Sequence, residues 1–486
     1  MKSHALLITA LATPILGRTV HSVIVFSRHG DRTSKVYPGY QMTSLGAQQC
    51  YNSGSFYRDL YVADGAPSQI ADISSTQADH AQLWASAPEQ PVLFQTATNF
   101  LQGLYPPLQS LDSNLATEEL ANGTSIEGPL NAYQYVHIQG EADNAPDTIW
   151  LKGDDACPAW NRASRTYRDS TEYQATLART AEFYSQFDGL LGPILGAENV
   201  SFAKAYDVFD LLNTAKVHNE SIAGQISDEN LDEARYLANE WEWNMNYNSS
   251  LPDRSIGGES LLGGMLRQIK SVVDDEAATK FSLMTGSYDT FLAFFGIMGL
   301  PAVEPNFYGI PDYASTITFE LYSEADNATF PAAGNVDEEL LVRFLFRNGT
   351  EADSELTSYA LADLPVEESG GVKYGAFRNG LEGDAMSSVG AWCQRCGSQA
   401  EFCLSADATM DGETASSSAG NENGGQNSGL SAAAGGGIGA GVTLAVVAAV
   451  ALLAWVMLRK RSSAVVGEKG SQDDLFHKSV SDSESV

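Results

Sequence analysis

The sequence predicts an α/β fold whose central sheet is interrupted by a long helical insertion. Residues 23–26 form an apolar, β-branched run that is typical of a buried strand. Apolar residues then recur at helical spacing over 231–241 and again over 262–272. Alternating apolar residues, the pattern of a strand, return at 317–321 and 342–346. A sheet built from both ends of one domain, with helices between them, accounts for all three observations.

The first seventeen residues have the pattern of a secretory signal peptide. Lys2 stands early, an apolar stretch runs from Ala5 to Leu11, and the small residues Ala12 and Gly17 follow. This stretch is too short to span a bilayer, which takes about 20 apolar residues. We therefore expect an exported protein whose large domain begins at residue 18.

The large outer domain is expected over residues 18–403. Its α/β core would come from about 18–104 and about 280–403, and residues from about 105 to 279 would form a mainly helical cap.

The first predicted strand ends abruptly in a histidine between two arginines. Arg28, His29 and Arg32 follow it, and Gly30 lets the backbone turn sharply, so the three side chains would converge at the strand's carboxyl end. Guanidinium groups match phosphate oxygens, and a neutral imidazole nitrogen can attack phosphorus. The pattern indicates a phosphate site with a histidine nucleophile. The alternative is a surface turn without chemistry, because an Arg-His-Gly triplet alone is a weak signal.

At these residues the chain resembles the histidine acid phosphatase family, the branch of the histidine phosphatase superfamily that includes fungal phytases and secreted acid phosphatases. The resemblance covers roughly residues 19–403 and is closest to a membrane-anchored, fungal-type member. It implies a phosphoglycerate-mutase-like core with a helical cap. It also implies phosphomonoester hydrolysis through a phosphohistidine, without a metal or other cofactor. Four further segments carry the resemblance: Met42–Gln49, in which Thr43 would cap a helix, Ile73–Thr76, Phe100–Pro106 and Gly286–Thr290.

Three positions depart from the family's pattern. The family's third phosphate-site segment begins with an arginine where Ser74 stands here, and a second arginine aligns with His80. The family's Gly-His-Asp histidine is replaced by Tyr288. Ser74, the Tyr288 hydroxyl and a cationic His80 at acidic pH are candidate substitutes. Alternatively, Tyr288 packs in the core and His80 lies on a helix surface. The resemblance thus implies a phosphate clamp that keeps Arg28 and Arg32 but is altered elsewhere.

Asp289 has two compatible interpretations. The resemblance implies a general acid that protonates the leaving oxygen, a role that needs a carboxyl group kept protonated near the working pH. Its place between the apolar run 281–284 and the helix-like segment 290–298 also suits an N-cap. We expect both roles together.

The charge of the chain excludes nucleic acid as a partner. Its 61 acidic and 28 basic residues give a formal net charge of −33, which leaves no basic face for a phosphate backbone. Such a surface also repels phosphorylated substrates at long range, so binding a phosphorylated small molecule must rely on the local arginines.

The C-terminal part predicts a membrane anchor. Residues 404–436 are rich in Ser, Gly, Ala and Asn and read as a flexible stalk. Residues 437–458 are apolar and of spanning length, and Arg459-Lys460-Arg461 follow at once. With 459–486 as a cytoplasmic tail, we expect a single-pass type I protein of the secretory pathway. Its large domain would be extracellular or lumenal, at the cell surface or in a vacuole.

Sequons and cysteines agree with this topology. The five cysteines are an odd set, so at least one thiol stays free or pairs between chains. Cys393 and Cys396 have Cys-x-x-Cys spacing, but without a second such pair or a nearby histidine they favour structural disulfides over a metal site. Six Asn-x-Ser/Thr sequons lie on the expected outer side: Asn122, Asn199, Asn219, Asn248, Asn327 and Asn348.

Three functions remain open from the sequence. The leading one is a phosphomonoester hydrolase in which Arg28 and Arg32 hold the phosphate, His29 is the nucleophile and Asp289 the acid. The second is a catalytically weak or inactive relative that binds phosphorylated ligands, because Ser74 and Tyr288 alter the clamp. The third is an adhesion or scaffold domain that uses the fold without its pocket.

Overall fold

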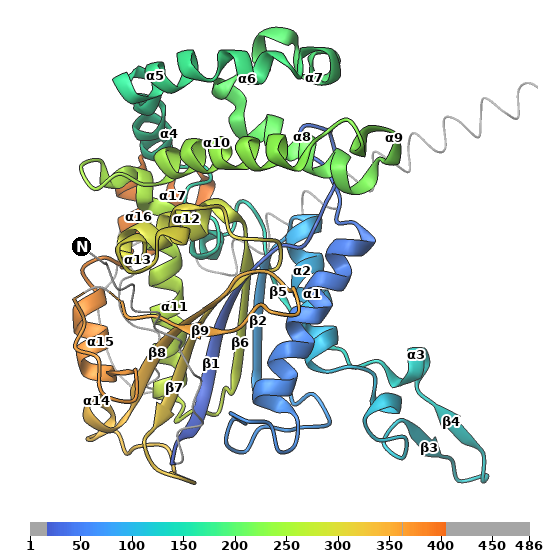
Figure 1. The fold of residues 1–486 in the computed structure, drawn as a ribbon. Coiled ribbons are helices and arrows are strands. Elements are labelled where there is room, and N and C mark those ends of the chain that lie inside the picture. The colour runs from blue at the N-terminus through green and yellow to red at the C-terminus, as the bar shows by residue number, and fades with distance from the viewer. Residues whose placement is uncertain (1–16, 362, 405–486) are drawn as a thin grey trace, which may run out of the picture. The chain divides into compact units, whose positions relative to one another are not determined.

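The computed structural model describes residues 17–361 and 363–404, which form a mixed α/β fold around one main sheet (Figure 1). The sheet has the strand order β10-β8-β7-β1-β6-β2-β5, with β9 paired to β8, and a separate hairpin joins β3 to β4. The strands are β1 (Thr19–Arg28), β2 (Leu83–Pro88), β3 (Thr117–Glu119), β4 (Ser125–Glu127), β5 (Gln139–Glu141), β6 (Phe281–Gly286), β7 (Thr316–Ser323), β8 (Leu341–Arg347), β9 (Thr357–Ser358) and β10 (Val372–Lys373).

Strand β1 lies in the middle of the sheet. It runs parallel to β6 and antiparallel to β7, and β2 runs parallel to β6 on the far side. The register places Arg28 opposite Gly286, so β1 and β6 reach the same edge together. All ten residues of β1 are buried, as expected of a central strand covered on both faces. The residues that follow β1 and β6 therefore meet at one edge of the sheet.

Successive residues of β1 face opposite layers of helices. Val23 and Val25 belong to the core that includes residues of α1 and α2, while Ile24 and Phe26 belong to the core formed with α11 and α12. The helices are α1 (Ser44–Tyr57), α2 (Pro91–Leu104), α3 (Pro129–Ala132), α4 (Pro158–Arg165), α5 (Thr171–Arg179), α6 (Ala181–Ser185), α7 (Asp188–Leu195), α8 (Ala205–His218), α9 (Glu220–Ala223), α10 (Asp228–Asn246), α11 (Ile256–Asp274), α12 (Tyr288–Ile297), α13 (Leu300–Val303), α14 (Val336–Glu339), α15 (Tyr374–Leu381), α16 (Val389–Cys396) and α17 (Glu401–Leu404).

A helical cap lies over the carboxyl edge of β1 and β6. Helices α4 to α10 form this layer in Figure 1, and α8 and α10 pack against each other within it. Within the segment 105–279, which the sequence assigns as a mainly helical cap, α11 instead packs against α12 and contacts β1. The same segment supplies β5 to the sheet.

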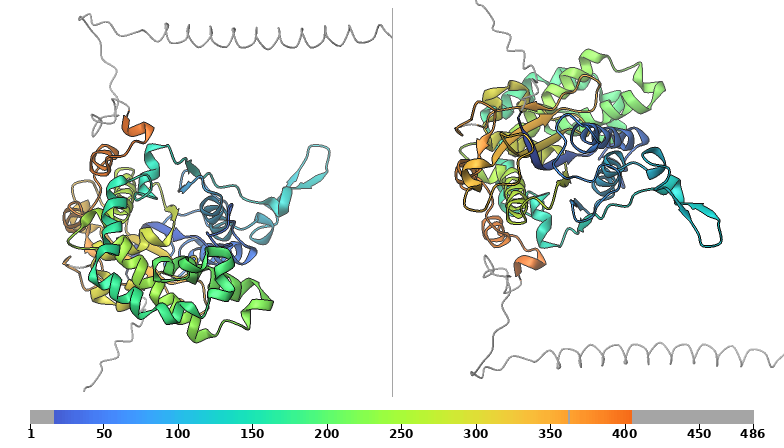
Figure 2. Two further views of the ribbon diagram at one scale, coloured as in Figure 1. Left: turned by 90° about the horizontal axis from the view of Figure 1, so that it is seen from above. Right: turned by 90° about the horizontal axis from the view of Figure 1, so that it is seen from below.

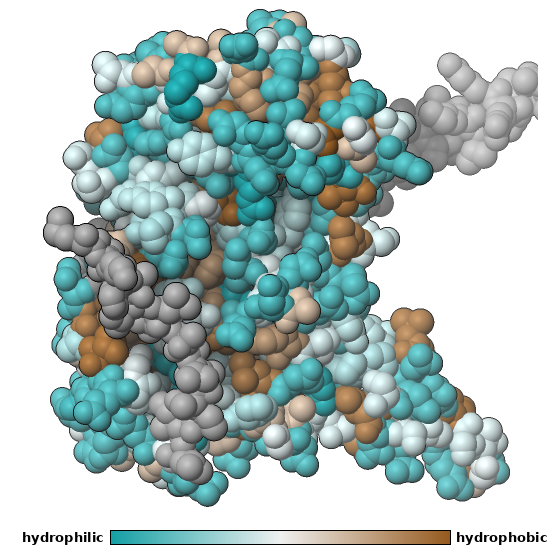
Figure 3. Space-filling view, in the orientation of Figure 1, coloured by the Kyte–Doolittle hydropathy of each residue, from teal (hydrophilic) through white to brown (hydrophobic). Residues whose placement is uncertain are grey.

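Residues 106–138 carry the β3–β4 hairpin, which projects from the rest of the domain (Figures 1 and 2). The base of this arm is held by Gln134, whose side chain bonds the backbone of Thr76, Ala78 and Pro106. Apolar residues on the arm contribute to the brown surface at that side of Figure 3, where most of the visible face is polar. The exposed large apolar residues of the arm are Leu115, Ile126, Leu130 and Tyr135.

Two disulfides close the domain at its C-terminal end. They join Cys157 to Cys396 and Cys393 to Cys403, so the two cysteines of the Cys-x-x-Cys pattern belong to different bonds. Cys50 is the free cysteine of the described chain and is buried. The predicted odd thiol and structural disulfides are thus confirmed. Residues 17–361 and 363–404 contain no cluster of three or more His, Cys, Asp or Glu suited to a metal ion.

Within these same ranges no helix is long and apolar enough to cross a membrane. The predicted span 437–458 lies outside the described residues, as do the stalk 404–436 beyond its first residue, the tail 459–486 and all but the last residue of the predicted signal peptide.

Candidate active site

The residues after β1 form a tight loop, here called the histidine loop (residues 28–35). The backbone N–H of His29 donates to the carbonyl of Gly286 at the end of β6 (3.2 Å), and the carbonyl of His29 accepts from the amide of Ala314 before β7 (3.0 Å). A Cβ on Gly30 would lie 2.2 Å from the carbonyl oxygen of Gly46, so glycine is needed there for the close approach of α1. The neighbouring strands and α1 thus fix the direction of the histidine.

One ring nitrogen of His29 is hydrogen-bonded and the other is not. Nδ1 lies 2.9 Å from the carbonyl oxygen of Gly30, so Nδ1 carries the proton and donates it to that acceptor. Nε2 is buried without a hydrogen-bond partner and keeps its lone pair. Burial and the nearby cations Arg28, Arg32 and Lys35 hold the pKa of His29 well below its ordinary value of 6.5. The ring therefore stays neutral even in mildly acidic solution.

Arg28 lies between the backbone and two tyrosine rings. Its Nη1 donates to the carbonyl of Pro311, and its Nε is buried without a partner. Its guanidinium carbon is 4.5 Å from the ring centre of Tyr313 and 5.3 Å from that of Tyr288. Tyr313 also lies against the imidazole of His29, with ring centres 5.7 Å apart. Only 2 % of His29 is exposed, so a ligand could reach Nε2 only if a neighbouring side chain moved. Tyr313 contacts both Arg28 and His29.

Arg32 is held by the cap rather than left free. Its Nη1 donates to both carboxylate oxygens of Asp210 on α8 (2.9 and 3.3 Å), and its Nη2 donates to the hydroxyl of Tyr206 (2.9 Å). Burial alone would lower the pKa of Arg32, but Tyr206 and Asp210 outweigh it and raise that pKa. Asp210 also accepts from the Ser34 hydroxyl (2.6 Å) and the Lys35 amide (3.0 Å). Of the Arg32 nitrogens, Nε is the one buried without a partner.

Tyr288 joins the same cluster from the start of α12. Its ring stacks on that of Tyr206 at 4.6 Å, and the Lys35 ammonium lies 4.8 Å from its centre. Its side chain is hydrogen-bonded to Glu242 of α10. Burial, with Glu242 next, raises the pKa of Tyr288 well above 10, so its phenol remains a neutral donor. Tyr288 is thus both packed and part of the polar network.

Buried carboxyl groups surround Asp289. Burial, followed by the charge of Asp289, raises the pKa of Glu242 to about 8 and that of Asp154 to about 7. Burial lowers the pKa of Lys35, which faces Asp289, Glu242 and Asp210. The cluster therefore stores protons at acidic and neutral pH beside the predicted acid.

Asp289 occupies the first turn of α12 but is not its N-cap, which is Ser287. One carboxylate oxygen of Asp289 accepts from the amide of Thr290 at 3.0 Å. The predicted cap was wrong by two residues because α12 begins at Tyr288, directly after the turn that ends β6. A carboxylate in the first turn still meets the positive end of the helix dipole.

A family model of the histidine phosphatase superfamily (branch 2) matches residues 36–347. The chain belongs to this superfamily. The match starts directly after the histidine loop and spans most of the sheet and the cap.

Solved structures with a similar chain path include phytases and an inositol polyphosphate phosphatase. The Citrobacter braakii phytase is 14 % identical, with 76 % of this chain and 99 % of that chain covered and a TM-score of 0.49. Hafnia alvei phytase bound to myo-inositol hexakis sulphate is 13 % identical, covering 77 % and 99 %, with a TM-score of 0.48. The Bifidobacterium longum multiple inositol polyphosphate phosphatase is 14 % identical, covering 75 % and 92 %, with a TM-score of 0.43. No curated protein matches the chain significantly.

In this member of the superfamily, Ser74 and His80 lie away from the histidine loop. Both belong to the loop before β2, at the amino end of the parallel strands, whereas the histidine loop follows the carboxyl end of β1. The amide of Ser74 donates to Gln82 Oε1, and its hydroxyl bonds the carbonyl of Gln77. Their assignment as clamp substitutes is corrected accordingly.

The carboxyl end of β2 is the edge from which a clamp residue would reach the phosphatase site. That edge is followed by residues 89–93, Glu-Gln-Pro-Val-Leu, which contain no cation. This segment therefore brings no cation toward the histidine loop.

Several residues of the site came from positions that no motif marked. Tyr206 and Asp210 lie on the cap helix α8, and Tyr313 lies in the loop before β7. Lys35 follows the second arginine by three residues, so its nearness in sequence was the one available signal.

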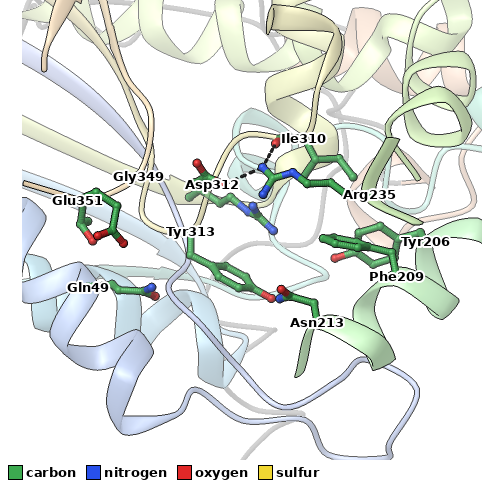
Figure 4. A pocket seen from close by; sticks show the side chains of 12 residues that line it. Gln49, Tyr206, Phe209, Asn213, Arg235, Ile310, Asp312, Tyr313, Gly349 and Glu351 are labelled. Atoms are coloured by element: carbon green, nitrogen blue, oxygen red, sulfur yellow. Dashed lines mark hydrogen bonds and ion pairs between the residues drawn. The ribbon is translucent and has the colours of Figure 1, made fainter. Parts of the chain in front are cut away.

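A pocket of about 240 Å³ opens beside Arg28 (Figure 4). Helix α8 lines one side of it, and α1 and the loop after β8 line the other. Figure 4 shows the Tyr313 ring between these two sides. The lining residues are Arg28, Gln49, Tyr206, Phe209, Asn213, Arg235, Ile310, Asp312, Tyr313, Gly349, Thr350 and Glu351.

Proposed function

We propose that this protein is a phosphomonoester hydrolase that acts through a phosphohistidine on His29. The observation that carries the proposal is the free, buried Nε2 of a neutral imidazole whose Nδ1 proton is fixed on the Gly30 carbonyl. A fixed tautomer keeps the lone pair on Nε2, which a nucleophile needs. Arg28, whose Nε has no partner, supplies the nearest charge for the phosphate oxygens.

The reaction then takes two displacements. Nε2 of His29 attacks phosphorus, the P–O bond to the alcohol breaks, and Asp289 gives its proton to the leaving oxygen. Water next attacks the phosphohistidine, and a proton of the water passes to Asp289. The N–P bond breaks and inorganic phosphate is released. The raised pKa values of Glu242 and Asp154 support a proton supply around Asp289 at working pH.

Turnover should be slow. Arg32 is already paired with Asp210, and the end of β2 brings no cation. Loss of one transition-state donor lowers a rate by about 100- to 1000-fold, and clustered groups do not add. In this proposal Arg28 is the main phosphate ligand, and Nε of Arg32 and the Tyr288 hydroxyl are weaker donors.

The experiment compares the purified full-length protein with two histidine variants. Aryl phosphate hydrolysis is measured between about pH 3 and 7, and rapidly quenched protein is analysed for acid-labile phosphate by mass spectrometry. His29→Ala should lose both signals, whereas His80→Ala, which changes an exposed histidine at the other end of the sheet, should keep them. Equal hydrolysis by wild type and His29→Ala would sink the assignment.

A second candidate is binding of phosphorylated ligands without turnover, and the Arg32–Asp210 pair favours it. Arg32, neutralised by Asp210, would stabilise a transition state poorly, whereas Arg28 would still be available to bind a phosphate. This function is indicated if phosphate raises the unfolding temperature of wild type but not of Arg28→Ala, while no hydrolysis is seen.

We also propose that the domain is extracellular or lumenal and is anchored in the membrane by residues 437–458. The two disulfides support an oxidising compartment. The exposed sequon residues Asn122, Asn219, Asn327 and Asn348 are accessible to a glycosyltransferase. Glycosidase digestion that leaves the mobility of the cell-derived protein unchanged would contradict this placement.

A further inference from the structure

The pocket beside Arg28 is where the alcohol half of a substrate has room. With about 240 Å³ it falls below the roughly 300–1,000 Å³ of pockets that enclose drug-sized ligands. Arg28 lines this space, so a phosphate held by Arg28 would lie at its wall. The space accepts one small ring or a short chain, and a larger alcohol would extend past the rim.

The charges that line the pocket cancel. Arg235 of α10 donates to a carboxylate oxygen of Asp312 at 2.6 Å and to the carbonyl of Ile310 at 3.1 Å, so this cation already has its partners (Figure 4). Glu351 lines the opposite side, and among the described residues no cation pairs with it. Arg28 is thus the lining cation that remains for an anionic ligand.

The rest of the lining is aromatic, apolar or neutral. Tyr206, Phe209 and Asn213 reach in from α8, and Tyr313 lies across from them (Figure 4). Burial raises the pKa of both tyrosines, so their hydroxyls stay neutral. Aromatic faces pack favourably on an apolar ring, and the Asn213 amide can bond one hydroxyl.

A second phosphate group on the substrate would meet the wrong charges. A phosphate at the rim faces Glu351 on one side and the neutralised Arg235–Asp312 pair on the other, and the net charge of −33 adds repulsion. Polyphosphorylated alcohols need several free cations around the site, and the described lining offers one.

We propose that this pocket selects monophosphate esters of small, uncharged alcohols that carry an apolar ring, and rejects esters with further phosphate groups. The inference rests on the proposed function, because it assigns the substrate class of the same site. Glu351 acts as a specificity-determining residue, and it takes no part in the chemistry.

The test measures kcat/KM of the full-length protein for phenyl phosphate and for inositol hexakisphosphate at one pH. Phenyl phosphate should be favoured by at least about 100-fold. Glu351→Lys should lower that ratio at least tenfold by improving inositol hexakisphosphate, because it replaces a repelling charge with an attracting one. Glu118→Lys makes the same charge change on the exposed β3 strand, far along the chain from the pocket, and should leave the ratio unchanged.

Binding is measured in parallel, by calorimetry with the His29→Ala variant and the same two esters. Tighter binding of phenyl phosphate supports the inference even if neither ester is hydrolysed. An absence of hydrolysis would refute only the proposed function. Equal or tighter binding of inositol hexakisphosphate overturns the inference whatever the turnover. An unchanged ratio in Glu351→Lys overturns the role of the pocket wall.

Discussion

Arg32 and Asp210 form a buried ion pair that joins the histidine loop to the cap, with Nη1 of the arginine 2.9 Å from Oδ1 of the aspartate and side chains 0 % and 2 % exposed. The pair couples the position of α8 to that of the histidine loop. It also places a carboxylate where the clamp of a phosphatase would otherwise offer a free guanidinium. Under the proposed function, Asp210 of the cap would therefore compete with phosphate for Arg32.

Asp210→Asn should separate stability from phosphate binding. Removing one partner of a buried pair leaves Arg32 as an unpaired buried charge and should cost about 3–5 kcal/mol in the free energy of unfolding. Phosphate supplies the missing negative charge, so it should raise the unfolding temperature of the variant more than that of wild type. Thermal unfolding with and without inorganic phosphate measures both effects.

The matched control is Asp207→Asn on the same helix. Asp207 pairs with Lys204, whose side chain is 47 % exposed, and surface pairs contribute only about 0–1 kcal/mol. If the free energy of unfolding falls no more in Asp210→Asn than in this control, the Arg32–Asp210 pair contributes little to stability.

Tyr288→His should raise turnover. The substitution restores the histidine that the family carries at this position and provides a cationic donor at acidic pH, where a neutral phenol now stands. A single transition-state donor gives about 100- to 1000-fold at best, so we expect an increase of about tenfold or more in kcat. The stacking on Tyr206 is lost, at a cost of about 1 kcal/mol.

Tyr288→Phe is the comparison for that prediction. It keeps a ring for the contact with Tyr206 but removes the hydroxyl that bonds Glu242. If Tyr288→His hydrolyses an aryl phosphate no faster than Tyr288→Phe, position 288 does not limit catalysis.

The strands and helices that bury a continuous apolar face were predictable from the sequence. The run 23–26 became the centre of β1, the alternation at 317–321 and 342–346 became β7 and β8, and the helical spacing at 231–241 became α10. Thr43 caps α1 as predicted, because its side chain accepts the amide of Gly46. These signals are local, and burial reinforces each of them.

The parts of the site that the sequence hid come from long-range contacts. Asp210 reaches Arg32 across 178 residues, and nothing in the pattern of α8 distinguishes it from a surface aspartate. Ser74 was misplaced because a four-residue match carries no information about which end of the sheet it occupies. Strand β2, which decides this, reads Leu-Trp-Ala-Ser-Ala-Pro and lacks the β-branched residues that mark strands.

Glu242 should make the protein less stable as the pH rises. Its pKa is raised from 4.5 to about 8 on folding, so the folded state binds the extra proton between these values. Its contribution is complete below about pH 4.5 and is lost as the pH rises through 8, at roughly 1.4 kcal/mol for each pKa unit. Glu242→Gln, which keeps the shape without the titration, should flatten the decline in unfolding temperature over this range.

Buried His21 changes the stability with pH in the opposite direction to Glu242. The unfolding temperatures of Glu242→Gln and wild type must therefore be compared at each pH. The pKa of His21 falls to about 4 on folding, so its contribution to stability is lost as the pH falls from 6.5 toward 4. Glu229→Gln, at an exposed position on the same helix α10, serves as the control and should follow the wild-type profile. A Glu242→Gln profile parallel to wild type would contradict the assignment.

The two disulfides should contribute unequally. The bond between Cys157 and Cys396 closes 239 residues and that between Cys393 and Cys403 closes 10. Chain entropy then predicts losses of roughly 5 and 3 kcal/mol when each pair is replaced by serine. Denaturant unfolding of the two double variants tests the order, and an equal loss would show that native-state contacts outweigh the loop lengths.

Gly46→Ala should displace the nucleophile without touching it. A Cβ at this position would lie 1.9 Å from the carbonyl oxygen of Asp31. Because that oxygen belongs to the backbone, no side-chain rotation can relieve the clash. The histidine loop would therefore shift against the start of α1, and a displacement of about 1 Å can cost about 100-fold in rate. Gly189→Ala on α7 meets no atom within 4 Å and should be neutral or slightly stabilising. Wild-type kcat/KM in Gly46→Ala would mean that the loop tolerates the shift, and that the contact between Gly30 and Gly46 does not set the direction of His29.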